Sequence, residues 1–295
     1  MEKHAYLFIV FNNFKVLEKS LKLIDDERND IYIHLDKKSN NKEEVERITS
    51  KLKKSDVYFT ERTDVRWGDY SLLNCEVLLL KNATQVQKYK YYHLLSESDM
   101  PLKTQNEIHK FFKKNQGIEF IEFQDFPKNK LFETRFKCYH IFSKSIRHPN
   151  KIIRYITYIL RKSYVILQYI FKHDRTKKYK IDIKYGSNWC SITDDMARYI
   201  VEQEKLIYKI FNHGSCVDEH FLQTMAYNSK FKEKLSGEGN MRLIIWEKNS
   251  NSPYVFKSSD YAKLINSNKL FARKFQEKED FKVVEKMFNR LNNEE

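Results

Sequence analysis

Short apolar runs alternate with stretches of helical periodicity through the first third of the chain. Four runs are short and rich in aromatic and β-branched residues, which predicts buried strands at 4–11, 31–36, 56–61 and 89–98. Between them, apolar residues spaced three and four apart predict helices at 14–24, 42–54 and 70–87. Strands that alternate with helices indicate an α/β fold with a mixed, mostly parallel sheet flanked by helices.

The alternation continues less regularly beyond residue 100. A helix is expected over 104–114, where Thr104 and Glu107 have the spacing of a capping box. Further strands are expected at 118–123 and 241–247, and a further helix at 218–229. A strand followed by a helix that Thr193 caps is expected within 186–203. Residues 258–275 open with a Ser/Asp cap and end in a basic aromatic cluster.

Three polar or aromatic residues fall at or near the predicted ends of strands, namely Asp36, Trp67 and Asp99. Ligands of parallel α/β sheets bind beyond the carboxyl ends of the strands. The sequence therefore predicts a ligand site at this edge of the sheet.

The segment 147–180 differs from the rest of the chain. It holds ten Lys or Arg residues against one Asp, so it supplies +9 of the net charge of +14. Arg161 and Lys162 interrupt its apolar blocks, which are too short to span a bilayer. Two interpretations are open: a helical lid that packs on the sheet with a solvated basic face, or an interfacial helix on anionic lipid.

Length and composition indicate a globular protein. We expect one domain over residues 1–295, with a basic hydrophobic helical insertion at about 147–180, and no disorder beyond the Asn- and Glu-rich ends. The four cysteines have no metal-binding spacing, so no zinc site is expected. The N-terminal apolar stretch is too short for a secretory signal, which predicts a cytoplasmic protein, with peripheral contact at the inner face of the membrane.

The net charge of +14 calls for an anionic partner: nucleic acid, phospholipid or a phosphorylated ligand. No helix-turn-helix, zinc-finger or aromatic RNA-binding pattern occurs, and the charge is concentrated in one segment. Nucleic acid is therefore not the expected partner. A basic nucleic-acid- or membrane-binding protein without activity stays open as an alternative.

Seven motifs carry a family resemblance: HAYLFIVFNNF, IYIHLDKKS, VRWGDYSLLNCEVLLL, YYHLLSESDMPLKT, GSNWCSIT, DEHFLQT and KLFARKF. They occur in the order found in the core-2/I-branching glycosyltransferase family. That family includes β-1,6-N-acetylglucosaminyltransferases and peptide O-xylosyltransferases. The chain resembles a bacterial member from about residue 4 to residue 282, least between 128 and 180.

The resemblance implies a GT-A type fold and an inverting transfer that needs no metal or other cofactor. The donor implied is a UDP-sugar, with N-acetylglucosamine the sugar expected. The acceptor implied is a hydroxyl of a glycan or lipid-linked glycan in bacterial surface polysaccharide synthesis. A xylosyltransferase-like enzyme that uses another UDP-sugar is the alternative.

The resemblance also assigns the chemistry to particular residues. Glu219 matches the catalytic base, and Asp218 beside it is expected to cap the helix or to orient the base. Arg273 and Lys274 match the positions that bind the diphosphate, where other enzymes use a metal held by an Asp-x-Asp pair. A basic helix end stabilised by the helix dipole is the alternative interpretation of the two cations.

The remaining assignments concern the nucleotide and the acceptor. The residues that match nucleotide-binding positions are Val10, Phe11, Asp36 and Trp67. Phe11 departs from the family, because animal relatives carry His there. The residues that match sugar- or acceptor-binding positions are Asp99, Trp189, Glu133 and Arg135. Xylosyltransferases carry Asp where Asn188 stands, so no catalytic role is expected of position 188.

Overall fold

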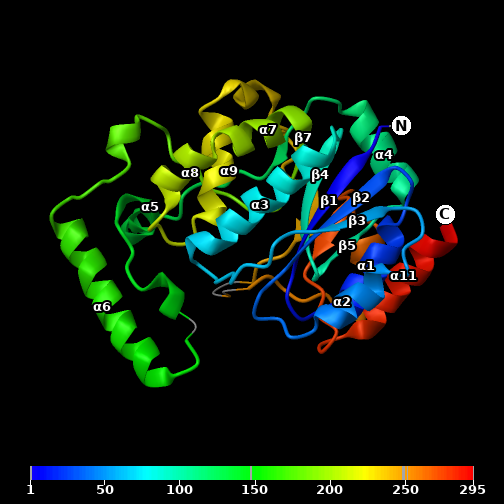
Figure 1. The fold of residues 1–295 in the computed structure, drawn as a ribbon, viewed down its shortest axis with the longest axis horizontal. Coiled ribbons are helices and arrows are strands. Elements are labelled where there is room, and N and C mark those ends of the chain that lie inside the picture. Colours follow the sequence, from blue (N-terminus) through cyan, green and yellow to red (C-terminus); the bar gives the residue numbers. More distant parts are fainter. Residues whose placement is uncertain (1, 147, 248–249, 251, 295) are drawn as a thin grey trace.

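Six strands form the central sheet, in the order β3–β2–β1–β4–β7–β6 (Figure 1). The computed structural model describes residues 2–146, 148–247, 250 and 252–294. The strands are β1 (His4–Val10), β2 (Asn29–Leu35), β3 (Asp56–Phe59), β4 (Tyr91–Ser96), β6 (Phe120–Ile121) and β7 (Cys190–Thr193). The first four are parallel, and β7 is antiparallel to β4 and β6. The predicted α/β fold with a mixed, mostly parallel sheet is confirmed.

Helices cover both faces of this sheet (Figure 1). They are α1 (Phe14–Ile24), α2 (Lys42–Thr49), α3 (Tyr70–Val86), α4 (Gln105–Lys114), α5 (Thr134–Lys137), α6 (Lys151–Ile170), α7 (Asp194–Glu202), α8 (Glu204–Phe211), α9 (Asp218–Tyr227), α10 (Tyr261–Ile265) and α11 (Phe281–Glu294). Short 3-10 turns lie at Lys130–Glu133, Ser143–Ser145, Lys177–Tyr179, Lys230–Lys234 and Ser258–Asp260. Two of the three predicted caps are confirmed: Thr104 and Glu107 form a capping box, and the Thr193 hydroxyl accepts from Met196 N. At the predicted Ser/Asp cap, Asp260 is the N-cap residue of α10, but its side chain makes no capping hydrogen bond to that helix.

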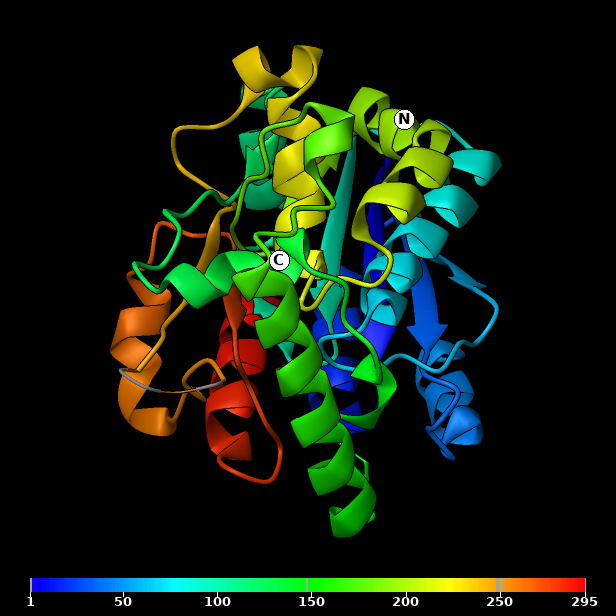
Figure 2. The same cartoon turned by 90° about the vertical axis from the view of Figure 1, so that its left-hand side faces the viewer.

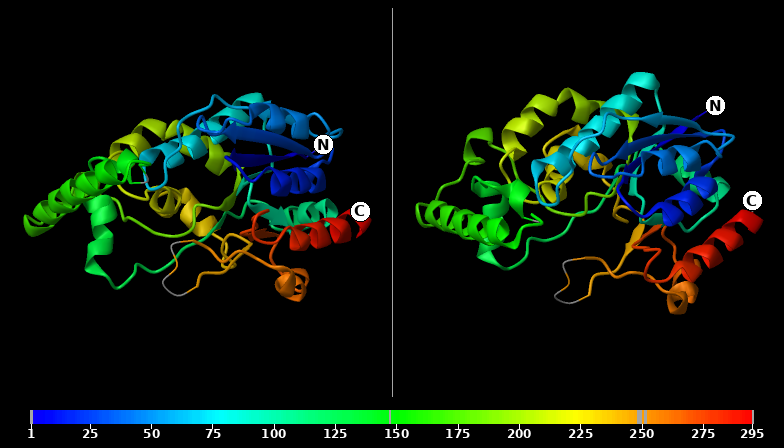
Figure 3. Two further views of the ribbon diagram at one scale, coloured as in Figure 1. Left: turned by 90° about the horizontal axis from the view of Figure 1, so that it is seen from below. Right: turned by 60° about the horizontal axis from the view of Figure 1, so that its bottom comes forward.

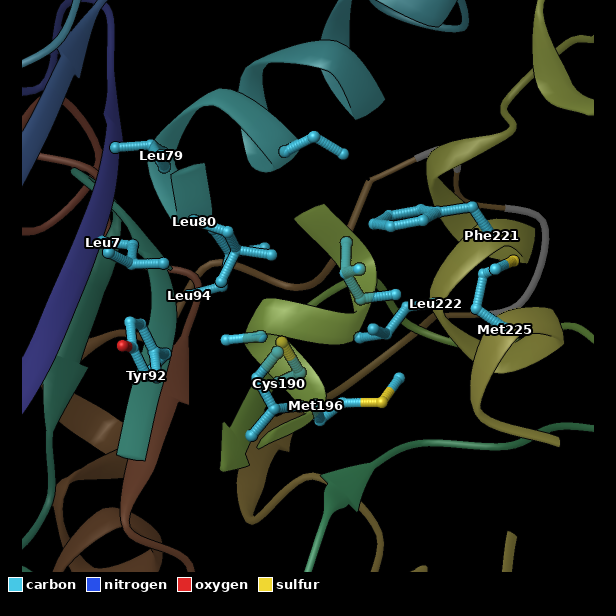
Figure 4. Close-up of a cluster of buried hydrophobic side chains, with 14 of the residues drawn as sticks. Leu7, Leu79, Leu80, Tyr92, Leu94, Cys190, Met196, Phe221, Leu222 and Met225 are labelled. Carbon is cyan, nitrogen blue, oxygen red and sulfur yellow. The ribbon is translucent and has the colours of Figure 1, made fainter. Parts of the chain in front are cut away.

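Two layers of apolar side chains enclose the sheet. On one face α3, α7 and α9 pack against it, and Figure 4 shows Leu7 and Leu94 of the sheet near Leu80 of α3. On the other face α1, α2 and α4 bury their apolar residues. Because both faces are covered, β1 and β2 are buried along nearly their whole length.

The register of the parallel strands brings their ends together. Val10 pairs with Leu35 at the end of β1 and β2, and Ile9 pairs with Ser96 of β4. The residues that follow these three strands therefore share the carboxyl edge of the sheet.

A second sheet of three short strands lies beside this edge, in the order β5–β9–β8. It consists of β5 (Asp99–Pro101), β9 (Phe271–Arg273) and β8 (Arg242–Ile244). The register pairs Asp99 with Arg273. The basic aromatic cluster thus ends a strand, and the interpretation of Arg273 and Lys274 as a helix end is wrong.

The C-terminal end is ordered, contrary to the expectation from its composition. Helix α11 packs on α1 and buries four apolar side chains, Val283, Val284, Met287 and Leu291. Its apolar residues recur at helical spacing, which the high Asn and Glu content of this end conceals.

Helix α6 lies at the periphery of the protein, apart from the two sheets, in Figures 1 and 3, and in front of the rest of the chain in Figure 2. None of its residues is buried, so the interpretation as a lid that packs on the sheet is wrong. Arg147, the first residue of the predicted segment, lies outside the described residues. Within the described part of the chain, no helix is long and apolar enough to cross a membrane.

Candidate active site

A pocket of about 700 Å³ opens at the carboxyl ends of β1, β2 and β4. Its wall includes seven residues that the sequence had assigned to ligand binding: Val10, Phe11, Asp36, Trp67, Trp189, Arg273 and Lys274. The other four, Asp99, Glu133, Arg135 and Glu219, are not part of this wall. The predicted nucleotide and diphosphate residues therefore gather around one cavity.

Asp36 follows β2 and is paired with a lysine of its own loop. Its carboxylate accepts hydrogen bonds from the backbone N–H of Lys38, at 2.8 Å, and from Lys38 Nζ, at 3.0 Å. Lys38 Nζ also lies 2.9 Å from Asp64. Among the residues that the structure describes, no three His, Cys, Asp or Glu side chains are grouped so as to hold a metal ion.

Glu97 is a pocket residue that the sequence analysis missed. It follows β4, and its Oε2 accepts a hydrogen bond of 3.1 Å from the backbone N–H of Phe11. Burial raises the pKa of Glu97 to about 7. Its position just after a strand, inside the SESDMP motif, is the same signal that pointed to Asp36 and Asp99.

Arg273 is held on three sides at the end of β9. Its guanidinium lies 4.3 Å from the centroid of the Trp189 ring and 3.1 Å from Asp99 Oδ1, and it donates to the Ser96 hydroxyl. Asp99 is buried and also accepts from the backbone N–H of Ser96. Asp99 thus orients Arg273, which faces the pocket.

Cations outnumber acids around the pocket. Six Lys or Arg residues contribute to its wall: Lys38, Arg66, Lys144, Arg273, Lys274 and Lys278. The acids of the wall are Asp36, Glu97 and Glu277. A concave site with excess positive charge favours an anionic ligand.

Glu219, the predicted base, is the second residue of α9 and is bound by Arg135. Arg135 Nη1 donates to Glu219 Oε2 at 2.9 Å, and both side chains are 32% exposed. Burial raises the pKa of Glu219, and the charge of Arg135 opposes that rise. Among the residues predicted to bind the sugar or the acceptor, Arg135 thus pairs with the base, whereas the exposed Glu133 pairs with Lys137.

Backbone contacts connect the start of α9 to the loops that carry pocket residues. Cys216 N donates to Gly68 O at 3.1 Å, next to Trp67. Gly186 N donates to the carbonyl of Glu219 at 3.0 Å. A Cβ on Gly186 would lie 1.9 Å from the carbonyl oxygen of Glu122, so only glycine can lie this close to the backbone of Glu122. The base is therefore fixed relative to the Trp67 and Trp189 loops.

Asp218 does not cap α9. Val217 occupies the N-cap position, and Asp218 Oδ1 is buried with no hydrogen-bond partner among the described residues. Burial, with the adjacent charge of Glu219, raises the pKa of Asp218 to about 7. The predicted capping role is therefore wrong. The other expected role of Asp218, to orient the base Glu219, stays a prediction.

Asn188 has a structural role that its departure from the xylosyltransferase pattern did not reveal. Its Nδ2 donates to Oε1 of Glu76, on α3, at 2.7 Å. Glu76 is buried, and burial together with the charge of Asp218 raises its pKa well above the usual range. The amide of Asn188 therefore satisfies one oxygen of a buried carboxyl group behind the site.

Sequence comparison finds relatives over most of the chain. Xylosyltransferase sqv-6 of Caenorhabditis briggsae is 25% identical over 92% of this chain and 34% of its own length. The N-acetyllactosaminide beta-1,6-N-acetylglucosaminyl-transferase of Mus musculus is 22% identical over 92% of this chain and 68% of its own length. The chain thus spans about a third of the length of the xylosyltransferases that it matches.

Comparison with solved structures finds only weak similarity. The crystal structure of S. aureus TarS 1–349 aligns with 98% of this chain and 71% of that chain, with 10% sequence identity and a TM-score of 0.42. A similarity at this level does not bear on function.

A family match covers most of the chain but ends before Arg273 and Lys274. The sequence model of the family described as "Branch: Core-2/I-Branching enzyme" matches residues 4–271. That range contains the pocket residues that follow β1, β2 and β4, together with Glu219 and the start of β9. The chain belongs to the Core-2/I-branching enzyme family.

Proposed function

We propose that the chain transfers a sugar from a UDP-sugar to a hydroxyl group of a glycan. The first candidate for that sugar is N-acetylglucosamine. The observation that carries the proposal is the cationic pocket, which joins Arg273 and Lys274 to Phe11, Asp36 and Trp67. The aromatic and acidic residues suit a nucleoside, and guanidinium and ammonium groups suit a diphosphate. Membership of the family supports the reaction type.

The reaction that we propose is a single displacement. Glu219 removes the proton of the acceptor hydroxyl, whose oxygen attacks the anomeric carbon while the bond to UDP breaks. Attack opposite the leaving group inverts the configuration. Arg135 keeps one oxygen of Glu219 in place and favours its ionised, basic form.

The departing diphosphate needs positive charge, which we assign to Arg273 and Lys274 rather than to a metal ion. The contact of Arg273 with Asp99 and Trp189 supports this assignment, because it fixes the guanidinium before the donor binds. The ion pair between Lys38 and Asp36 also supports the assignment, because the Asp36 carboxylate already has a cationic partner without a metal ion.

Xylose is the second candidate sugar. The relatives support both sugars by name, since they comprise xylosyltransferases and an N-acetylglucosaminyltransferase. The acceptor that we propose is a lipid-linked glycan of a bacterial surface polysaccharide. This choice of acceptor rests on the resemblance of the sequence motifs and on the exposed basic helix α6.

A panel of UDP-sugars tests the proposal. Thermal protection and donor hydrolysis are measured with UDP-N-acetylglucosamine, UDP-xylose and UDP alone, each with and without excess EDTA. We expect protection by UDP, hydrolysis of one sugar donor, and no effect of EDTA. Activity that is lost on chelation and returns with manganese contradicts the metal-free assignment. Filter binding to RNA without any response to UDP contradicts the enzyme assignment.

A further inference from the structure

The polarity of α6 is reversed with respect to the protein body. Its less exposed residues are Thr157, Arg161, Val165 and Gln168, and their spacing puts them on one stripe of the helix. The amide of Gln168 bonds to both N and O of Tyr139, at 2.8 and 2.9 Å. This stripe, which is polar except for Val165, therefore faces the protein, whereas surface helices ordinarily turn their apolar side inward.

The opposite side of α6 is a broad apolar face. Its members are between 42% and 80% exposed: Ile152, Ile153, Tyr155, Ile156, Ile159, Leu160, Ile166, Leu167, Ile170 and Phe171. A contiguous exposed patch of this kind indicates contact with another protein or with a membrane.

The borders of the apolar face carry amphipathic side chains. The helical spacing places Lys151, Lys162 and Tyr169 along one border of the apolar face, and Tyr164 at the opposite border. Lysine and tyrosine side chains keep an apolar stem or ring in a hydrocarbon layer and a polar tip in water. No acidic residue occurs between Lys151 and Ile170.

A groove of about 490 Å³ runs between α6 and the segment before it. Lys151, Arg154 and Arg161 line it, together with the hydroxyl groups of Ser145 and Thr157. In the described part of the chain, none of these three cations has an Asp or Glu at ion-pair distance. Arg161 is partly buried, and this burial lowers the pKa of its guanidinium.

This surface adjoins the donor pocket. Ser143, Lys144 and Pro149, in the segment that leads into α6, belong to the pocket wall, and Ser145 lines the groove. A partner that binds α6 would therefore lie next to the rim of the donor pocket.

We propose that α6 lies parallel to the surface of an anionic bilayer, with its apolar face among the acyl chains and its flanking cations at the headgroup phosphates. Lys151 and Lys162, at the border of the apolar face, would reach the lipid phosphates. A second copy fits less well, because two α6 helices would bring only like charges together. The docking does not depend on sugar transfer, and it places a lipid-borne acceptor at the pocket.

The experiment measures flotation of the protein with vesicles, with no donor present. Vesicles of phosphatidylcholine with phosphatidylglycerol are compared with vesicles of phosphatidylcholine alone, at low and high salt. We expect binding to the anionic vesicles that weakens with salt, and little binding to the neutral ones. Wild-type protein that ignores anionic vesicles at low salt overturns the proposal.

Variants separate the apolar face from the charges. Ile156→Glu with Leu167→Glu, and separately Lys151→Gln with Lys162→Gln, should each weaken the partition by about tenfold or more. The matched controls are Val86→Glu, 46% exposed on α3, and Lys53→Gln with Lys54→Gln, exposed in the loop between α2 and β3; both should bind like the wild type.

The affinity for UDP and the oligomeric state are measured on the same variants. UDP affinity should not change in any of them, so a failure of docking is distinguishable from a failure of the donor site. If Ile156→Glu with Leu167→Glu leaves vesicle binding intact, or instead separates a stable dimer into monomers, a second copy or another surface is the partner, and the proposal is wrong.

Discussion

The guanidinium of Arg273 lies over the Trp189 ring, 4.3 Å from its centroid, while Asp99 holds one edge of the same group at 3.1 Å. A planar cation fixed by an aromatic face and a carboxylate loses little further freedom when an anion binds. Because the chain register pairs Asp99 with Arg273 across β5 and β9, this arrangement is part of the fold.

Removal of the guanidinium should therefore impair transfer more than folding. Arg273→Gln alone would leave Asp99 buried without its cation, so we choose Arg273→Gln with Asp99→Asn, which removes both charges. We expect turnover to fall by roughly 10²–10³-fold, the usual effect of losing one anion-stabilising donor. The measurements are turnover with the preferred UDP-sugar and the melting temperature. Arg290→Gln, at a partly exposed arginine on α11 that pairs with Glu294, serves as control; normal turnover in the double variant would contradict the diphosphate role.

Glu219→Gln tests the base. The amide keeps the size of the side chain and can still bond to Arg135, but it cannot take a proton. Turnover should fall by roughly 10²–10⁴-fold while the affinity for UDP, measured by calorimetry, stays the same. Glu202→Gln, on the exposed side of α7, should behave as the wild type. Turnover close to normal in the Glu219 variant would move the role to another carboxylate, with Asp99 first.

Arg135→Gln tests how the base is tuned. Arg135 favours the charged form of Glu219, so its loss should raise the pKa of that carboxyl group further. The base acts when ionised, and activity falls as the pH drops through its pKa. The acidic limb of the kcat profile should therefore move to higher pH, with turnover recovered in alkaline buffer. A uniform loss at every pH would mean that Arg135 acts on the acceptor instead.

Glu97→Gln tests a buried acid through stability. Its folded pKa of about 7 lies above the ordinary 4.5, so the folded state favours the neutral form. The resulting stabilisation is present at low pH and is lost as the pH rises from about 4.5 through 7. Relative to the variant, the wild type should lose about 2 kcal/mol of unfolding free energy between pH 5 and 7. Denaturant unfolding at both pH values measures this, and a parallel pH dependence in the two proteins would contradict it.

The local pattern predicted most of the central sheet and its helices. Helix α1 begins and ends at the predicted residues, and the capping box of α4 is present. These features depend on neighbours three and four residues apart, which the sequence displays directly. The strand predicted at 118–123 shortened to Phe120–Ile121 because only this part reaches β7.

The features that escaped prediction depend on distant parts of the chain. Residues Phe271–Arg273 form a strand because they pair with β5 and β8. No local sequence pattern predicts that pairing. The polar stripe of α6 was visible in the sequence, but its direction was not, since Gln168 and Tyr139 meet only in the folded chain. Glu97 is different: its position after a strand was readable and was overlooked.

The bond between Asn188 and Glu76 has a consequence for how this family diversifies. At a separation of 2.7 Å, an acid at position 188 would face the carboxyl group of Glu76, and the two groups could not both be ionised. Asp at position 188 is therefore compatible with this core only if position 76 is not an ionised acid. Burial already favours the neutral form of Glu76, and its proton could be shared with such an acid, so this core can accept Asp at position 188 as long as the pair keeps one proton.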